Sequence, residues 1–184
     1  MKIVTLLAAV AMTAIAASAR ATVVTFDDLT SDQVVANGYG GINWNGNWTA
    51  YSEDQPPYTA ESSPYRVYDQ SSGGDSFNFS TPVVFNGAYF AGNAFATVQF
   101  QLLLGGSVVA TSSILDPSAT PTFLASGYSG LVDEVDVLSP SPDFFVMDDV
   151  TYSGGVPEPA AWALMLIGVA GLGAALRGRR LSAA

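Results

Sequence analysis

The chain has 184 residues, of which 16 are Asp or Glu and only 6 are Lys or Arg, and it contains neither Cys nor His. The lack of these two residue types excludes disulfides, thiolate and imidazole metal sites, and catalysis by His or Cys. Between residues 22 and 156, fifteen carboxylates stand against the single basic residue Arg66. Such a surface repels phosphate groups, so the sequence predicts no nucleic-acid partner.

The N-terminus has the pattern of a secretory signal peptide. Lys2 is followed by an apolar run over residues 3–17, and the segment closes on the small residues Ala19 and Ala21. A basic start, an apolar centre and a small-x-small end are what signal peptidase requires. We therefore expect residues 1–21 to form a signal-peptide helix that is removed after Ala21. The alternative is a membrane helix that stays in place.

The body of the chain, residues 22–153, is predicted to be all-β. Alternating apolar and polar residues indicate strands, and Gly105-Gly106 between two such runs indicates a hairpin. The expected strands cover residues 83–90, 97–102, 107–114, 134–138 and 144–152, and no part of the body shows a sustained helical period. Short strands separated by Gly, Pro, Ser and Asn favour a single acidic β-sandwich domain of the jelly-roll kind.

Residues 37–68 are rich in tyrosine and tryptophan mixed with Gly, Asn and Pro. Exposed rings beside amides and carboxylates suit a carbohydrate site, because a ring stacks on the apolar face of a pyranose. We predict that Trp44 belongs to the core, and that Trp48 and Tyr51 are the best candidates for sugar contacts. The alternative is that these rings also pack the core.

Two pairs of aspartates frame the body, one near its first strand and one in its last. Strand alternation places Asp28 and Asp148 on the apolar side, where an unpaired carboxylate would be costly. First and last strands of such sandwiches are often neighbours, so a structural Ca²⁺ bridging the two is one solution. The arrangement resembles the Ca²⁺-bearing, galactose-binding-like jelly rolls of carbohydrate-binding modules. The alternative is that one Asp of each pair accepts backbone amides while the other is solvated.

The C-terminal end divides into three parts. Residues 154–159 form a linker, residues 160–176 are free of charge, and residues 177–184 are basic. The uncharged run is near the lower length limit for a transmembrane helix. The arginines that follow it favour a cytoplasmic C-terminus. With a signal peptide at the other end, this predicts a domain outside the inner membrane and a short basic tail inside.

The linker and tail together resemble the PEP-CTERM sorting signal. The resemblance rests on the linker motif, the apolar run and the terminal arginine cluster: Val156, Pro157, Glu158, Pro159, Arg177, Arg179 and Arg180. In that family an exosortase, a membrane peptidase, recognises the tail and cleaves near the motif. The resemblance implies that this chain is a substrate of such a peptidase. The two prolines would keep the motif extended above the membrane.

These features predict an exported protein of the cell envelope or extracellular matrix, anchored by its C-terminal helix until it is processed. It would be non-enzymatic and associated with exopolysaccharide or biofilm. A second hypothesis is a carbohydrate-binding module that uses exposed aromatics. A third is a carboxylate-based glycoside hydrolase. Apart from the Ca²⁺ considered above, the sequence implies no cofactor.

Overall fold

The computed structural model describes residues 20–69, 75–154 and 168. Over residues 20–154 the described regular structure consists of ten strands and two short 3-10 turns. The strands are β1 (Ala21–Val24), β2 (Gln33–Val34), β3 (Trp48–Tyr51), β4 (Arg66–Asp69), β5 (Asp75–Gly92), β6 (Gln99–Leu104), β7 (Ser107–Thr111), β8 (Thr122–Ala125), β9 (Val132–Leu138) and β10 (Phe145–Gly154). The turns are η1 (Tyr39–Gly41) and η2 (Pro142–Phe144). The all-β prediction is confirmed.

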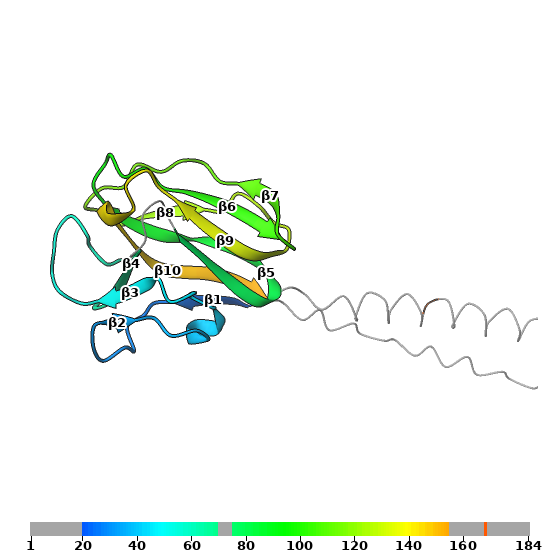
Figure 1. The fold of residues 1–184 in the computed structure, drawn as a ribbon, viewed down its shortest axis with the longest axis horizontal. Coiled ribbons are helices and arrows are strands. Elements are labelled where there is room, and N and C mark those ends of the chain that lie inside the picture. Colours follow the sequence, from blue (N-terminus) through cyan, green and yellow to red (C-terminus); the bar gives the residue numbers. More distant parts are fainter. Residues whose placement is uncertain (1–19, 70–74, 155–167, 169–184) are drawn as a thin grey trace, which may run out of the picture.

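The strands form one antiparallel network that folds into two packed layers (Figure 1). The first layer runs β2-β3-β4-β10-β5, with β1 also paired to β10 and β8 to β5. The second continues from β5 through β9 and β6 to β7. The long strand β5 serves both layers, since its residues 75–78 pair with β9 and its residues 83–92 pair with β10.

Phenylalanine rings join the two layers in the core. Phe85 of β5 lies edge-on to Phe100 of β6 with ring centroids 4.9 Å apart, although these two strands share no hydrogen bonds. Phe90 contacts the same ring from 5.5 Å. All three rings are buried. Edge-to-face pairs of this kind add to the burial of apolar surface that stabilises a sandwich.

Two sequence predictions about strand connections are confirmed. The Gly105-Gly106 pair joins β6 to β7, and both glycines have positive φ (59° and 74°), as a tight hairpin requires. The first and last strands are neighbours, with Val24 opposite Val150. The predicted signal-peptide and transmembrane helices lie outside the described residues, apart from residues 20 and 21 and the single helical residue Gly168.

Candidate functional site

The outer face of the β3–β4 pair carries two tyrosines and an arginine. Tyr51 stands opposite Arg66 in the antiparallel register. The rings of Tyr51 and Tyr68 meet edge to face with centroids 5.4 Å apart. The Arg66 guanidinium lies 4.0 Å from the centre of the Tyr51 ring. The ring and the cation therefore hold each other in place, because a guanidinium over a phenol face is attracted by its π electrons.

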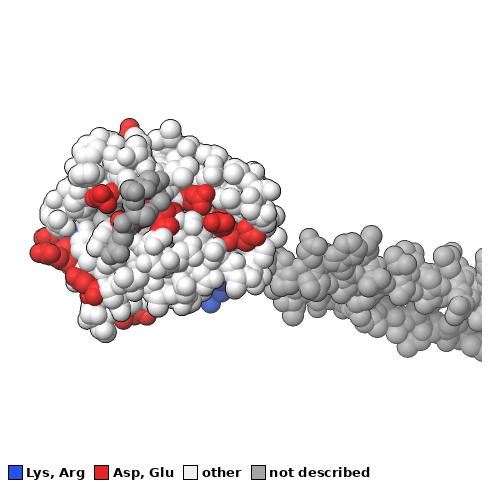
Figure 2. Space-filling model, viewed as in Figure 1, with Lys and Arg blue, Asp and Glu red and all other residues white. Residues whose placement is uncertain are grey.

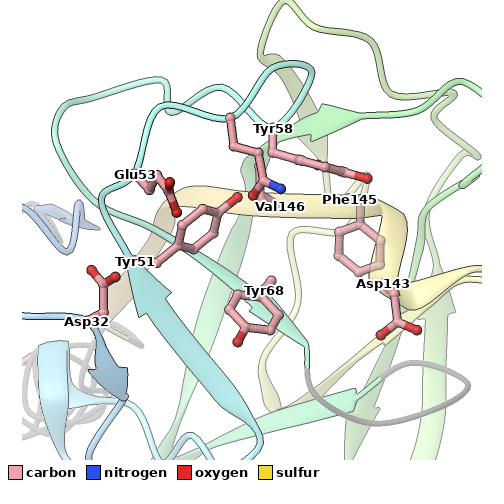
Figure 3. Close-up of a pocket in the computed structure, with 9 residues that line it drawn as sticks. Asp32, Tyr51, Glu53, Tyr58, Tyr68, Asp143, Phe145 and Val146 are labelled. Carbon is pink, nitrogen blue, oxygen red and sulfur yellow. The ribbon is translucent and has the colours of Figure 1, made fainter.

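A cleft of about 400 Å³ opens beside these rings (Figure 3). Its walls come from the end of the β1–β2 loop, β3, the loop after β3, β4, η2 and the start of β10. The lining residues are Asp32, Tyr51, Glu53, Gln55, Tyr58, Tyr68, Asp143, Phe145 and Val146. The Tyr58 hydroxyl accepts a hydrogen bond of 2.9 Å from the Asn93 side chain, which fixes this ring at the cleft. We call this site the tyrosine cleft.

The rim of the tyrosine cleft is acidic. Asp32, Glu53 and Asp143 are exposed and contribute carboxyl groups to it. The Ser52 backbone N–H donates to Asp32 Oδ1 over 3.0 Å and so orients that side chain. Figure 2 shows Asp and Glu side chains spread over one face of the domain, consistent with the negative charge of its sequence.

Below the rim the cleft is built from partly buried phenol rings. Tyr51, Tyr58 and Tyr68 are half-buried, whereas Phe145 and Val146 behind them are buried. Burial raises the pKa of Tyr51, and the Arg66 charge opposes that rise. Tyr51 is therefore a neutral phenol at physiological pH, able to donate and accept hydrogen bonds. The cleft thus combines ring faces, phenol hydroxyls, the Gln55 amide and carboxylates.

The prediction for Trp48 is wrong, whereas Tyr51 lies in the cleft. Trp48 is 0% exposed, and its indole Nε1 donates to the Ser76 carbonyl oxygen over 3.3 Å. The two residues are three positions apart on one strand, so their side chains point to opposite faces. Trp48 joins the buried Trp44, whose place in the core is as predicted.

The predicted burial of Asp28 is also wrong. Strand β1 ends at Val24, and Phe26 then adopts a left-handed φ of 62° in a turn closed by a hydrogen bond from Leu29 N to Phe26 O of 3.1 Å. Strand alternation therefore stops before it reaches Asp28, which is exposed and accepts a hydrogen bond from the Tyr39 hydroxyl. Its neighbour Asp27 accepts the Tyr65 backbone N–H over 3.0 Å.

Asp148, in contrast, is buried as predicted, at 2% exposure. Its Oδ2 accepts backbone N–H groups from Glu61 (2.9 Å) and Ser62 (3.0 Å), and its Oδ1 accepts that of Asp149 (2.7 Å). Burial raises the pKa of Asp148 to about 8, with Asp149 and Asp27 adding to the rise and the amide hydrogen bonds opposing it. The carboxyl group thus anchors the loop between β3 and β4 to β10.

This geometry does not fit a Ca²⁺ between Asp28 and Asp148. Calcium needs six to eight oxygen ligands, and the Asp148 oxygens already accept three amide groups. Over the described residues 20–69 and 75–154, no group of three or more Asp, Glu, His or Cys side chains is placed to hold a metal ion. Instead, one aspartate of each pair accepts backbone N–H groups, as in the alternative prediction: Asp27 in the first pair and Asp148 in the second.

Sequence reasoning did not select most of the residues that line the cleft. Tyr58 and Tyr68 lie in the aromatic segment but were not chosen, and Asp32, Glu53 and Asp143 come from three separate places in the chain. The alternation of β3 is a signal that would have separated Tyr51 from Trp48. No local pattern in the sequence brings Asp143 of η2 to the same cleft as Asp32.

Two predicted features, the sorting motif and most of the signal-peptide cleavage site, lie outside the described residues. The sorting motif at residues 156–159, the arginines at 177, 179 and 180, and Ala19 are not among them, while Ala21 is the first residue of β1. Within residues 20–69, 75–154 and 168, no helix is long and apolar enough to cross a membrane.

Comparison with known proteins identifies the C-terminal end. Residues 155–180 match the family described as the PEP-CTERM protein-sorting motif. The chain therefore carries a PEP-CTERM sorting motif, as the sequence predicts. No curated protein matches the chain.

Several solved structures of carbohydrate-binding modules are similar to this chain. One is a point mutant of CBM29-2, a family 29 module, with 14% identity over 75% of this chain and 94% of that one and a TM-score of 0.45. A second is described as a family 29 carbohydrate-binding module, with 13% identity, coverage of 76% and 91%, and a TM-score of 0.45. A third is a CBM29-2 mutant complexed with cellulohexaose, with 14% identity, coverage of 74% and 92%, and a TM-score of 0.44.

Proposed function

We propose that the domain binds a polysaccharide in the tyrosine cleft, and that this binding is the role of the exported protein in the cell envelope or extracellular matrix. The observation that carries the proposal is the position of Tyr51, Tyr58 and Tyr68 together in one cleft with carboxylates at its rim. A pyranose presents an apolar face and a ring of hydroxyls. The phenol rings suit the face, and the amide and carboxylate oxygens suit the hydroxyls.

The cleft is also prepared for a ligand before it binds. Arg66 holds Tyr51 from one side, Tyr68 contacts it edge to face, and Asn93 holds the Tyr58 hydroxyl. Rings that are already fixed lose little side-chain entropy when a ligand arrives. This supports binding by the cleft as it stands, without rearrangement of the loop.

The proposal is one of binding without hydrolysis. A glycosidase needs one carboxyl group that an apolar or buried setting keeps protonated, beside a second that is ionised. The rim carboxyls Asp32, Glu53 and Asp143 are all exposed. This supports a site that holds a glycan and releases it uncleaved.

The test is retention of the full chain on insoluble polysaccharides, with soluble oligosaccharide titration as the second measurement. Tyr51→Ala and Tyr68→Ala should each weaken binding about tenfold, the usual effect of removing a central aromatic contact. Phe95→Ala is the matched control, because Phe95 is an exposed ring, at 59%, that does not line the cleft. If no polysaccharide retains the protein, or if the control behaves like the cleft variants, the proposal fails.

We further propose how the chain is divided and processed. Residues 1–21 are the signal peptide, 22–153 the acidic domain, 154–159 the linker, 160–176 the transmembrane helix and 177–184 the basic tail. An exosortase-type membrane peptidase would recognise the linker motif and cleave near it, after which the domain remains in the envelope or is shed. The sorting-motif match over residues 155–180 supports this order of events.

The processing step is tested by following a tagged chain in the producing cells. A double variant Glu158→Ala, Pro159→Ala should accumulate in the membrane at the unprocessed mass. Ser182→Ala, beyond the arginines, should be processed normally. Identical release of both variants would show that the peptidase does not recognise this motif.

A further inference from the structure

The charge around the tyrosine cleft sets which polysaccharide it can accept. Asp32, Glu53 and Asp143 line the cleft beside the rings and are exposed, so the entrance carries three carboxyl groups. An acidic polysaccharide, such as a polyuronate, would bring its own carboxylates against them. Like charges repel each other, and dissolved salt screens this repulsion.

No basic side chain of the described residues is available at the cleft to reverse this. Over residues 20–69 and 75–154 the basic residues are Arg20 and Arg66. Arg66 is 3% exposed, and its guanidinium already faces the Tyr51 ring and donates to the Glu53 backbone oxygen. It therefore stabilises the cleft from behind and offers no surface to a ligand anion.

The same set of groups is well suited to an ammonium group. Carboxylates attract it through charge, and phenol faces attract it through the cation–π interaction. Tyr51 shows the second effect within the protein, since it already binds the Arg66 cation on one face. A sugar ring that carries an amine thus meets both kinds of partner, whereas a neutral sugar meets only the stacking surface and hydrogen-bonding groups.

We infer that the tyrosine cleft selects amino-sugar polymers whose amines are free and positively charged, over neutral polymers of the same backbone, and rejects polyuronates. This inference rests on the proposed function, because it names the ligand class of the same site. The property that the cleft would recognise is the positive charge of the sugar amine.

The probes are three oligosaccharides that share a β-1,4-linked pyranose backbone: cellohexaose, the N-acetylglucosamine hexamer and the glucosamine hexamer. A galacturonate oligomer provides the acidic case. Titration uses the full chain in mildly acidic buffer, in which the glucosamine amine is protonated. We expect the glucosamine hexamer to bind about tenfold more tightly than cellohexaose, since several exposed ion pairs act together. The gap should shrink in about 500 mM salt, and the galacturonate oligomer should not bind.

Two triple variants with the same change in net charge separate the cleft from the whole surface. In the first, Asp32→Asn, Glu53→Gln and Asp143→Asn remove the rim carboxylates. In the second, carboxylates that do not line the cleft are neutralised by Glu61→Gln, Asp116→Asn and Glu134→Gln. The rim variant should bind the glucosamine hexamer and cellohexaose alike, while the second keeps the preference for glucosamine. The second variant should also keep its binding of cellohexaose, because its three substitutions lie outside the cleft.

The possible outcomes distinguish failure of this inference from failure of the proposed function. Equal loss of the preference in both triple variants means that the overall charge of the domain attracts the amine, which overturns the inference. Tight cellohexaose binding without a preference for glucosamine also overturns it, and leaves the proposed function standing. If none of the oligosaccharides binds, the proposed function itself fails.

Discussion

The two faces of the β3–β4 pair use aromatic residues for different purposes. On the inner face, Trp48 and Val67 are 0% exposed and belong to the core. On the outer face, Tyr51 and Tyr68 are half-buried and line the cleft. Because side chains of a strand alternate, one short strand supplies both a core residue and a ligand-binding candidate. An aromatic-rich segment thus shows where a site lies only after its residues have been assigned to a face.

Carboxyl groups show the same contrast. Asp148 is buried and accepts three backbone amides, so it serves the structure. Asp32, Glu53 and Asp143 are exposed at the cleft, where a ligand can reach them. The carboxyl groups of this acidic domain therefore occupy two different environments, and substitution can tell their effects apart.

The largest effect is expected for the aromatic pair of β3. Trp48→Ala should lower the free energy of unfolding by about 3–5 kcal/mol, because it leaves a cavity in the core and removes the ring contacts of Trp44 and Phe77. Tyr51→Ala should cost about 1 kcal/mol, since its ring is only half-buried. Urea unfolding of both variants measures the difference. Equal losses would contradict the assignment of the two residues to opposite faces.

The next largest effect on stability is expected for Asp148 compared with Asp28, which were both predicted to lie on the apolar side of a strand. Asp148→Ala leaves the backbone N–H groups of Glu61 and Ser62 without their buried acceptor and should cost about 3 kcal/mol. Asp28→Ala at its exposed position should change stability by less than about 1 kcal/mol. Thermal unfolding compares them, and Asp148→Asn, which keeps one acceptor oxygen, should fall between the two.

A smaller effect is expected in the dependence of stability on pH. The pKa of Asp148 is raised to about 8 from an ordinary 3.8, so the folded protein keeps a proton that the unfolded chain releases. Its contribution is therefore fully present below about pH 4 and is lost as the pH rises toward about 8. Urea unfolding at pH 5 and at pH 8 should show a larger fall for the natural chain than for Asp148→Asn. The opposite order would mean that the amide hydrogen bonds outweigh burial.

The smallest effect is expected for Tyr58, in the loop between β3 and β4. Tyr58→Phe removes the hydroxyl that accepts the 2.9 Å hydrogen bond from Asn93, at a cost of about 1 kcal/mol. The loosened ring should also weaken polysaccharide binding severalfold. A drop in stability without any change in binding would show that Tyr58 is not part of the binding surface. Tyr128→Phe, at a tyrosine that does not line the cleft, is the matched control.

Much of the fold could be predicted because strands leave local signals. Alternation in residues 97–102, 134–138 and 144–152 located β6, β9 and β10, and Gly105-Gly106 located the hairpin between β6 and β7. The errors arose where alternation ended or was ignored. Phe26 turns the chain before Asp28. Trp48 and Tyr51 were both predicted to contact sugar, although the alternation of β3 places them on opposite faces.

The sequence by itself determined the PEP-CTERM sorting motif, since this signal is a continuous stretch of chain that needs no folded partner. It also determined the negative charge, the all-β body and the place of Trp44 in the core. Only the tertiary structure decided which carboxylates are buried and which surround the cleft. The reason is physical, because Asp32, Tyr68 and Asp143 meet through the pairing of strands distant in the chain, and no local pattern encodes that contact.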